Sequence, residues 1–60
     1  MQSDTLRTLR TLAGLTQSGL AASLGVHRVT VTRWETGAVP IPQWVELALP
    51  RLVDAITAAS

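Results

Sequence analysis

The stretch GLAASLGVHRVTVTRWE, residues 19–35, places apolar residues at helical spacing on both sides of a single glycine, Gly25. Before the glycine, a stripe that faces inward is formed by Leu20, Ala21 and Leu24. Glycine is typical of the position where a helix ends in a left-handed residue, so a helix is expected over residues 17–24. A second helix is expected from Arg28 to about Thr36. The stretch therefore predicts two helices joined by a short turn over residues 25–27.

The second of these helices has two different faces when successive residues are set about 100° apart. Val31 and Trp34 share the core side, with Thr30 and Glu35 beside them. The opposite side carries Arg28, Val29, Thr32, Arg33 and Thr36. Hydrogen-bonding groups, positive charge and an exposed methyl match the guanine acceptors, phosphates and thymine methyls of a DNA major groove. The plainer alternative is a solvated helix face that binds nothing.

The β-branched run over residues 29–32 would favour a strand if it stood alone. Helical spacing on both sides of it, and the lack of a hairpin partner, favour the helix. Upstream, a first helix is expected over residues 4–13, capped by Ser3 or Asp4 and followed by Gly14. Thr16 is expected to cap the helix over residues 17–24. Gly37 is expected to end the helix that carries the arginines.

The C-terminal segment over residues 42–59 is also expected to be helical. Pro42 suits the first turn of a fourth helix over residues 42–49. Pro50 lacks an N–H and would clash with the carbonyl of Glu46, so the chain either kinks there or begins a fifth helix. We favour a break. Inward positions in this segment are predicted to be Val45, Ala48, Leu49, Leu52 and Ile56.

Composition limits the classes of function that this chain can have. Sixty residues suffice for a single domain, here residues 1–60, and no enzyme is expected because the chain lacks Cys and Lys and has one His. For the same reason neither a metal nor a cofactor is expected, and no small-molecule ligand. No membrane span and no signal peptide is recognised, which favours a cytoplasmic protein. All five basic residues are Arg and the net charge is +1, a weak indication of a nucleic-acid partner.

The segment LRTLRTLAGLTQSGLAASLGVHRVTVTRWETGAVP, residues 6–40, resembles the helix-turn-helix domain of the lambda-repressor and Cro family. The matching features are LR before a glycine, GLTQ, LA, LGV, and WE followed by glycine and, three residues later, proline. The likeness extends over about residues 5–49 and implies a compact all-α, lambda-repressor-like domain of four or five helices whose motif spans residues 17–36. It implies that double-stranded DNA is the partner and that the protein is a transcriptional regulator, of the Cro repressor type.

The resemblance also implies roles for individual residues. Gln17 corresponds to a phosphate contact, and Arg10 and Glu35 correspond to a buried ion pair. The positions that read bases in the family correspond to His27, Arg28, Val29 and Thr32, with Arg33 able to reach bases or backbone. Simpler alternatives are a His27 that only precedes the helix, and a Gln17 that is merely exposed to solvent.

Three residues depart from the family pattern. Gly19 stands inside a helix, where glycine costs about 0.5–1 kcal/mol relative to Ala, so either the helix is weak or the backbone approaches DNA. Ala38 and Val39 replace cations that often follow the glycine corresponding to Gly37 in the family. Phosphate contacts from that loop are lost, and non-specific affinity for DNA is expected to be modest.

The C-terminal segment has more apolar positions than one small core can use. The surplus falls on a second face, which we predict to be a homodimer interface and which consists of Trp44, Leu47, Ala55 and Ala58. A dimer would read two half-sites, so an inverted-repeat operator is expected. The alternative function is a protein-interaction module, an antitoxin or adaptor that keeps the fold without strong DNA binding.

Overall fold

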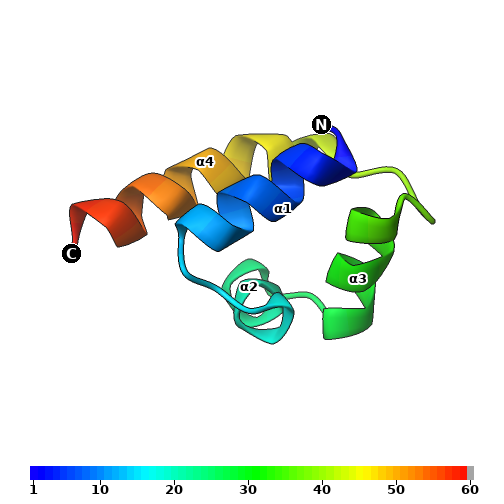
Figure 1. Ribbon diagram of the computed structural model, residues 1–60, viewed down its shortest axis with the longest axis horizontal. Coiled ribbons are helices and arrows are strands. Elements are labelled where there is room, and N and C mark those ends of the chain that lie inside the picture. The colour runs from blue at the N-terminus through cyan, green and yellow to red at the C-terminus, as the bar shows by residue number, and fades with distance from the viewer. Residues whose placement is uncertain (60) are drawn as a thin grey trace.

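The computed structural model describes residues 1–59, and over these the chain forms four α-helices and no strand. The helices are α1 (Ser3–Leu12), α2 (Gln17–Leu24), α3 (Arg28–Thr36) and α4 (Gln43–Ala58). In Figure 1, α1 and α4 lie side by side and run in the same direction, while α2 and α3 lie below them. The prediction of an all-α domain is confirmed, with four helices. None of them is long and apolar enough to cross a membrane, judged over the residues that the structure describes.

Side chains from all four helices, together with Ala13 just after α1, form one hydrophobic core. Three leucines, Leu6, Leu20 and Leu49, are completely buried, and burying each such side chain stabilises the fold by about 1.5–3 kcal/mol. The remaining buried apolar residues are Ala13, Ala21, Val31, Trp34, Val45 and Val53. The predicted inward residues of α2 and α3 therefore face the core as expected.

The turn between α2 and α3 depends on Gly25. Its φ of 73° is left-handed, a conformation that costs an L-residue about 1–2 kcal/mol and glycine little. This conformation lets the N–H of Gly25 donate to the carbonyl of Ala22 (3.3 Å) and the N–H of Val26 donate to that of Ala21 (2.9 Å). Carbonyls at the end of α2 are thus satisfied, and the chain turns sharply into α3.

The N-termini of α1 and α2 are capped differently. Thr16 caps α2 as predicted, because its Oγ1 accepts from the N–H of Gly19 at 2.9 Å. The prediction that Ser3 or Asp4 caps α1 is wrong: Gln2 occupies the cap position and makes no side-chain capping bond. Ser3 lies inside the helix, and its hydroxyl donates instead to the carbonyl of Trp34 at 2.8 Å, which ties α1 to the end of α3.

The break that we favoured at Pro50 is also wrong. α4 continues through Pro50 from Gln43 to Ala58. A proline inside a helix costs about 3 kcal/mol or more, and here packing outweighs that cost because Leu49 and Val53 on either side of it are both buried. Pro50 itself is exposed, so its ring meets solvent and not the core.

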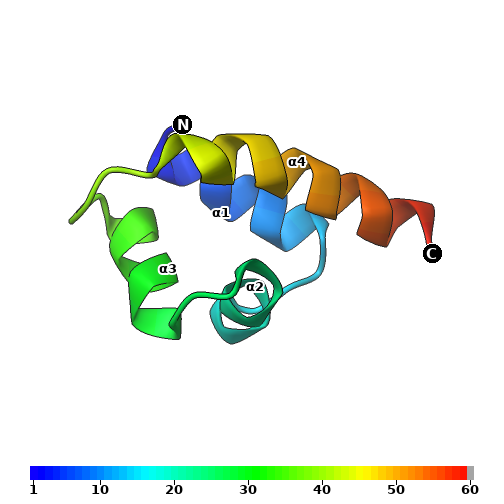
Figure 2. The same cartoon turned by 180° about the vertical axis from the view of Figure 1, so that it is seen from behind.

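The inward face of α4 differs slightly from the prediction. Val45 and Leu49 are completely buried, and Val53, which was not among the predicted inward residues, is 8% exposed. Two more of the predicted positions, Leu52 and Ile56, are partly buried and pack against the core, and Ala48 is half-buried. In both views the C-terminal end of α4 extends past the end of α1 (Figures 1 and 2). Part of α4 therefore lies beyond the helix that packs beside it.

Gly19 has a local explanation in the cap of its own helix. A Cβ at this position would lie 3.3 Å from the Oγ1 of Thr16 and 3.5 Å from the Cδ2 of Leu15. That space is slightly tight, since the same Oγ1 accepts from the Gly19 N–H. Glycine at this position leaves the capping hydroxyl undisturbed.

Candidate nucleic-acid interface

The outward face of α3 is a continuous polar and basic surface. Arg28, Arg33 and Thr36 are exposed, Thr32 is half-buried, and Val29 is 51% exposed despite being apolar. The inward face is closed, because Val31 and Trp34 are buried in the core. The buried positions agree with the core face predicted from the sequence, and of the predicted outward positions only Thr32 is half-buried and not exposed. α3 thus presents two guanidinium groups and the isopropyl group of Val29 on one side, while its other side packs in the core.

Arg10 of α1 and Glu35 of α3 meet behind that surface. The Arg10 Nε lies 2.6 Å from one carboxylate oxygen of Glu35, and its Nη2 lies 3.2 Å from the other. Glu35 is 4% exposed, and the Arg10 side chain 17%. Arg10 also donates from Nη1 to the carbonyl of Leu15 at 3.0 Å. Arg10 therefore links α1 both to α3 and to the loop that precedes α2.

Arg7 adds a second cation to the same carboxylate. Its Nε lies 3.6 Å from the Oε1 of Glu35, and its Nη2 donates to the Glu35 backbone carbonyl at 3.2 Å. Burial by itself would raise the pKa of Glu35. The hydrogen bonds from Arg10 and Gln17 and the positive charges of Arg10 and Arg7 outweigh burial, so its pKa lies below the ordinary value. Glu35 is therefore a carboxylate, able only to accept hydrogen bonds.

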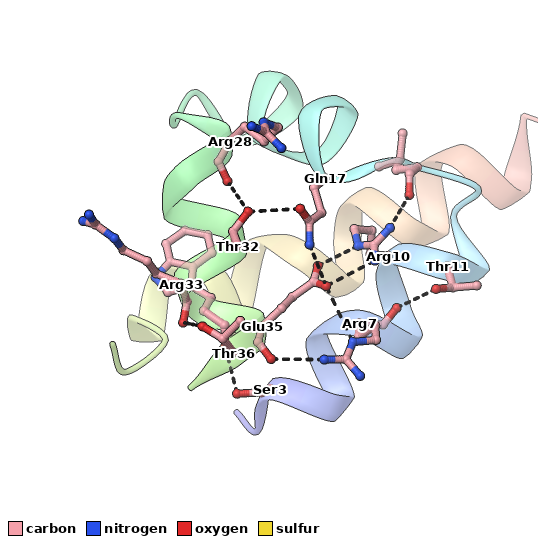
Figure 3. A network of polar contacts seen from close by, with 12 residues as sticks. Ser3, Arg7, Arg10, Thr11, Gln17, Arg28, Thr32, Arg33, Glu35 and Thr36 are labelled. Carbon is pink, nitrogen blue, oxygen red and sulfur yellow. Dashed lines mark hydrogen bonds and ion pairs between the residues drawn. The ribbon is translucent and has the colours of Figure 1, made fainter. Parts of the chain in front are cut away.

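Gln17 connects this ion pair to the outward face of α3. Figure 3 shows its amide between Glu35 and Thr32. The Gln17 Nε2 donates to the Oε1 of Glu35 at 3.3 Å, and the Gln17 Oε1 accepts from the Thr32 hydroxyl at 3.0 Å. The Thr32 hydroxyl also lies 3.1 Å from the backbone carbonyl of Arg28. A side chain predicted to contact phosphate is thus engaged within the protein as well.

Exposed side chains lie at both ends of α3. His27 is exposed at the N-cap position and makes no capping hydrogen bond with its side chain. Arg33, near the other end, points away from the polar network in Figure 3. The loop that follows carries exposed Ala38 and Val39, so it presents no cation beside α3.

The residues predicted to form a dimer interface all lie on the exposed side of α4. Trp44 is 45% exposed and Leu47 is 60% exposed, and both Ala55 and Ala58 are exposed. Trp44 is not wholly uncovered by the fold, because its ring packs edge-on against Trp34 with centroids 6.2 Å apart. Exposed apolar side chains thus recur along α4 from Trp44 towards its C-terminus, with the exposed Arg51 among them.

Several contacts gave no signal in the sequence. The bridge from Gln17 to Thr32, the second cation at Glu35 and the bond from Ser3 to the Trp34 carbonyl all join residues distant in the chain. The N-terminal amine of Met1 pairs with Glu46 on α4 in the same way. Within residues 1–59, no group of three or more His, Cys, Asp and Glu side chains is arranged to hold a metal ion.

The arrangement of two helices about a glycine turn, with the second presenting a basic face, is that of a helix-turn-helix motif. A family model described as a helix-turn-helix domain matches residues 3–59. The chain belongs to this family of Cro-like helix-turn-helix domains. No curated protein and no solved structure matches the chain. Membership implies DNA binding and transcriptional regulation, and the family is typically non-enzymatic.

Proposed function

We propose that this domain is a sequence-specific regulator of transcription, a repressor of the Cro type that acts in the cytoplasm by occupying its operator. The observation that carries the proposal is the two-sided character of α3: Arg28, Val29 and Arg33 face solvent, while Trp34 and Glu35 hold the opposite side in the core. A recognition helix needs this combination, because base contacts require side chains that are free and a helix that does not move.

Each exposed group on α3 suits a particular part of duplex DNA. Arg28 lies at the N-terminal end of the helix, where side chains of such motifs reach base edges, and its guanidinium matches the two acceptors of guanine. Val29 suits a thymine methyl, and His27 lies beside them. Arg33, one turn further along, can reach a base or a phosphate. Gln17, at the start of α2, is assigned to a phosphate, where the helix N-terminus adds favourable dipoles.

The exposed side of α4 supports a homodimer. Trp44, Leu47, Ala55 and Ala58 leave apolar surface exposed to solvent on α4, and apolar patches of this kind mark interfaces. A two-fold dimer would place two α3 helices on half-sites about 10 base pairs apart. The operator is therefore an inverted repeat, and DNA completes a dimer that is weak by itself.

Selection from a pool of random duplexes tests the proposal directly. We expect one inverted-repeat sequence to be enriched, and its affinity to fall as salt is raised, because cations that contact phosphates displace counterions. Arg28→Ala should weaken the enrichment by flattening the preference at one base pair per half-site, whereas Arg7→Ala, which removes the same charge from an exposed side chain of α1, should keep the full preference. A pool that stays unselected at low salt contradicts the proposal.

One observation favours a second candidate. The loop after α3 offers Ala38 and Val39 in place of cations, and the net charge is +1, so the phosphate contacts available to the domain are few. A protein-interaction module, an antitoxin or adaptor, would need no more charge than this. Weak binding to every duplex, with the same affinity for selected and random sequences, would support that alternative.

A further inference from the structure

The polar chain from Glu35 to the surface of α3 has a fixed hydrogen-bond direction. Glu35 is an ionised carboxylate and only accepts, so the Gln17 amide must turn its nitrogen towards it. The amide oxygen then faces Thr32 and only accepts, so the Thr32 hydroxyl must donate. The buried charge therefore sets the orientation of two side chains that reach the DNA-facing side of the motif.

The Thr32 hydroxyl has no hydrogen left for a base. Its neighbours are the Gln17 Oε1 at 3.0 Å and the Arg28 backbone carbonyl at 3.1 Å, and both are acceptors. A hydroxyl has a single hydrogen, so it stays within the protein with either partner. Donation to a guanine acceptor would require breaking a bond that the fold already makes.

The Gln17 amide, in contrast, keeps a donor. Its nitrogen carries two hydrogens, and Glu35 takes one of them. A side-chain amide that is held at both ends loses little rotational entropy when it binds, whereas a free Gln must first be ordered. The second N–H is therefore a pre-oriented donor at the N-terminus of α2.

We propose that Thr32 is a positioning residue and not a base reader: its hydroxyl holds the Gln17 amide so that the remaining N–H is presented to a DNA phosphate. The inference rests on the proposed function, since it concerns the same DNA-facing surface. Thr32 would then contribute to the affinity for any duplex and Arg28 to the preference for one sequence, although the two residues lie one turn apart on α3.

A double-mutant cycle on duplex binding separates the two roles. Thr32→Val removes the hydroxyl and keeps a methyl group of the same shape, while Thr32→Ser keeps the hydroxyl. With the selected duplex and with random duplex as probes, Thr32→Val should lower affinity about 3- to 10-fold on both, as the loss of one hydrogen bond does. Thr32→Ser should retain affinity, and Thr32→Val should have no further effect in a Gln17→Ala background.

Other outcomes overturn the proposal. A changed preference at one base pair in Thr32→Val, persisting in the Gln17→Ala background, would make Thr32 a base reader. Unchanged affinity in Thr32→Val would show that the hydroxyl positions nothing. Thermal melting of each variant shows whether the fold is retained.

A measurement without DNA distinguishes failure of this inference from failure of the proposed function. In the nitrogen-15 NMR spectrum of the free protein, the separation between the two side-chain amide protons of Gln17 should be larger than that of the exposed Gln2 and Gln43, because one of the Gln17 protons is bonded to Glu35. In Thr32→Val this separation should fall towards that of Gln2 and Gln43. A parent that shows the larger separation but binds no duplex refutes the proposed function, whereas a parent in which Gln17 shows the same separation as Gln2 and Gln43 refutes the positioning of Gln17.

Discussion

Removing the Glu35 side chain tests how far α3 depends on the ion pair behind it. In Glu35→Ala the Arg10 guanidinium loses both of its contacts to the carboxylate, at 2.6 and 3.2 Å, and keeps only its bond to the Leu15 carbonyl. Breaking a buried pair costs about 3–5 kcal/mol. Because Arg10 is 17% exposed and retains one partner, we expect the lower end, about 3 kcal/mol.

That loss is large for so small a domain. At about 0.05–0.15 kcal/mol per residue, the chain has a free energy of unfolding of about 3–9 kcal/mol. Thermal melting followed by circular dichroism should show a midpoint lowered by about 12 °C or more, since each kcal/mol shifts a domain of this size by about 4–8 °C. Arg7→Ala is the matched control, because the Arg7 side chain is 54% exposed and should cost under about 1 kcal/mol.

A second variant separates the pair itself from the buried charge that its loss leaves behind. Replacing both partners, as Arg10→Met with Glu35→Leu, removes the pair without leaving an unpaired charge, and such replacements are often neutral or stabilising. We expect the double variant to regain most of the lost stability. A Glu35→Ala protein that melts within a few degrees of the parent would refute this account, and so would a double variant less stable than Glu35→Ala.

Four further predictions concern charge, sequence preference, the α2 cap and assembly. Folding lowers the pKa of Glu35, so the stabilisation that its carboxylate gives the fold is complete above the ordinary value of 4.5 and is lost as the pH falls below it. In a pH series of denaturant titrations the free energy of unfolding should therefore decline in acid, and Glu35→Gln should flatten that decline. Arg28→Ala should flatten preference at one base pair per half-site, at a cost of about 1–3 kcal/mol in a binding selection, whereas a uniform loss over all sequences would make Arg28 a phosphate contact. Gly19→Ala should leave the melting midpoint nearly unchanged, because the gain of about 0.5–1 kcal/mol in helix propensity is offset by the new Cβ, which would lie 3.3 Å from the Thr16 hydroxyl. A midpoint raised by several degrees would show that the Thr16 hydroxyl moves aside at no cost. Leu47→Asp should leave melting unchanged and abolish self-association in analytical ultracentrifugation at high concentration, and an unaltered sedimentation profile would exclude this face of α4 from the dimer.

Sequence reasoning succeeded where the determining contacts are local. The bounds of α2 and α3 agree with the prediction, because Thr16, Gly25 and Gly37 act on residues within one turn of themselves. It failed at α1 and at Pro50 because the deciding contacts are distant. Ser3 donates to a carbonyl on α3, 31 residues away, and α4 continues past its proline because residues on both sides of Pro50 are buried against the other helices.

The candidate site shows the same limit. The two faces of α3 follow from its helical period, and the resemblance to the Cro family implied the pair of Arg10 with Glu35. The bridge from Gln17 to Thr32 joins two side chains 15 residues apart on different helices, and it depends on how α2 and α3 cross. No spacing in the sequence encodes that crossing. The sequence therefore predicts a DNA-facing Thr32, whereas in the fold the Thr32 hydroxyl is bonded within the protein.

The edge-on contact between Trp34 and Trp44 gives the protein an optical reporter of its own. The chain has no Tyr and no Phe, so all of its near-ultraviolet absorption and emission comes from these two rings. Trp34 is 3% exposed and Trp44 is 45% exposed, so a soluble quencher such as iodide reaches one and not the other. With centroids 6.2 Å apart and planes at 76°, the two indoles also couple as excited states, and the resulting circular dichroism couplet disappears when α3 and α4 separate. Folding and coverage of α4 can therefore be followed in the same cuvette without a label.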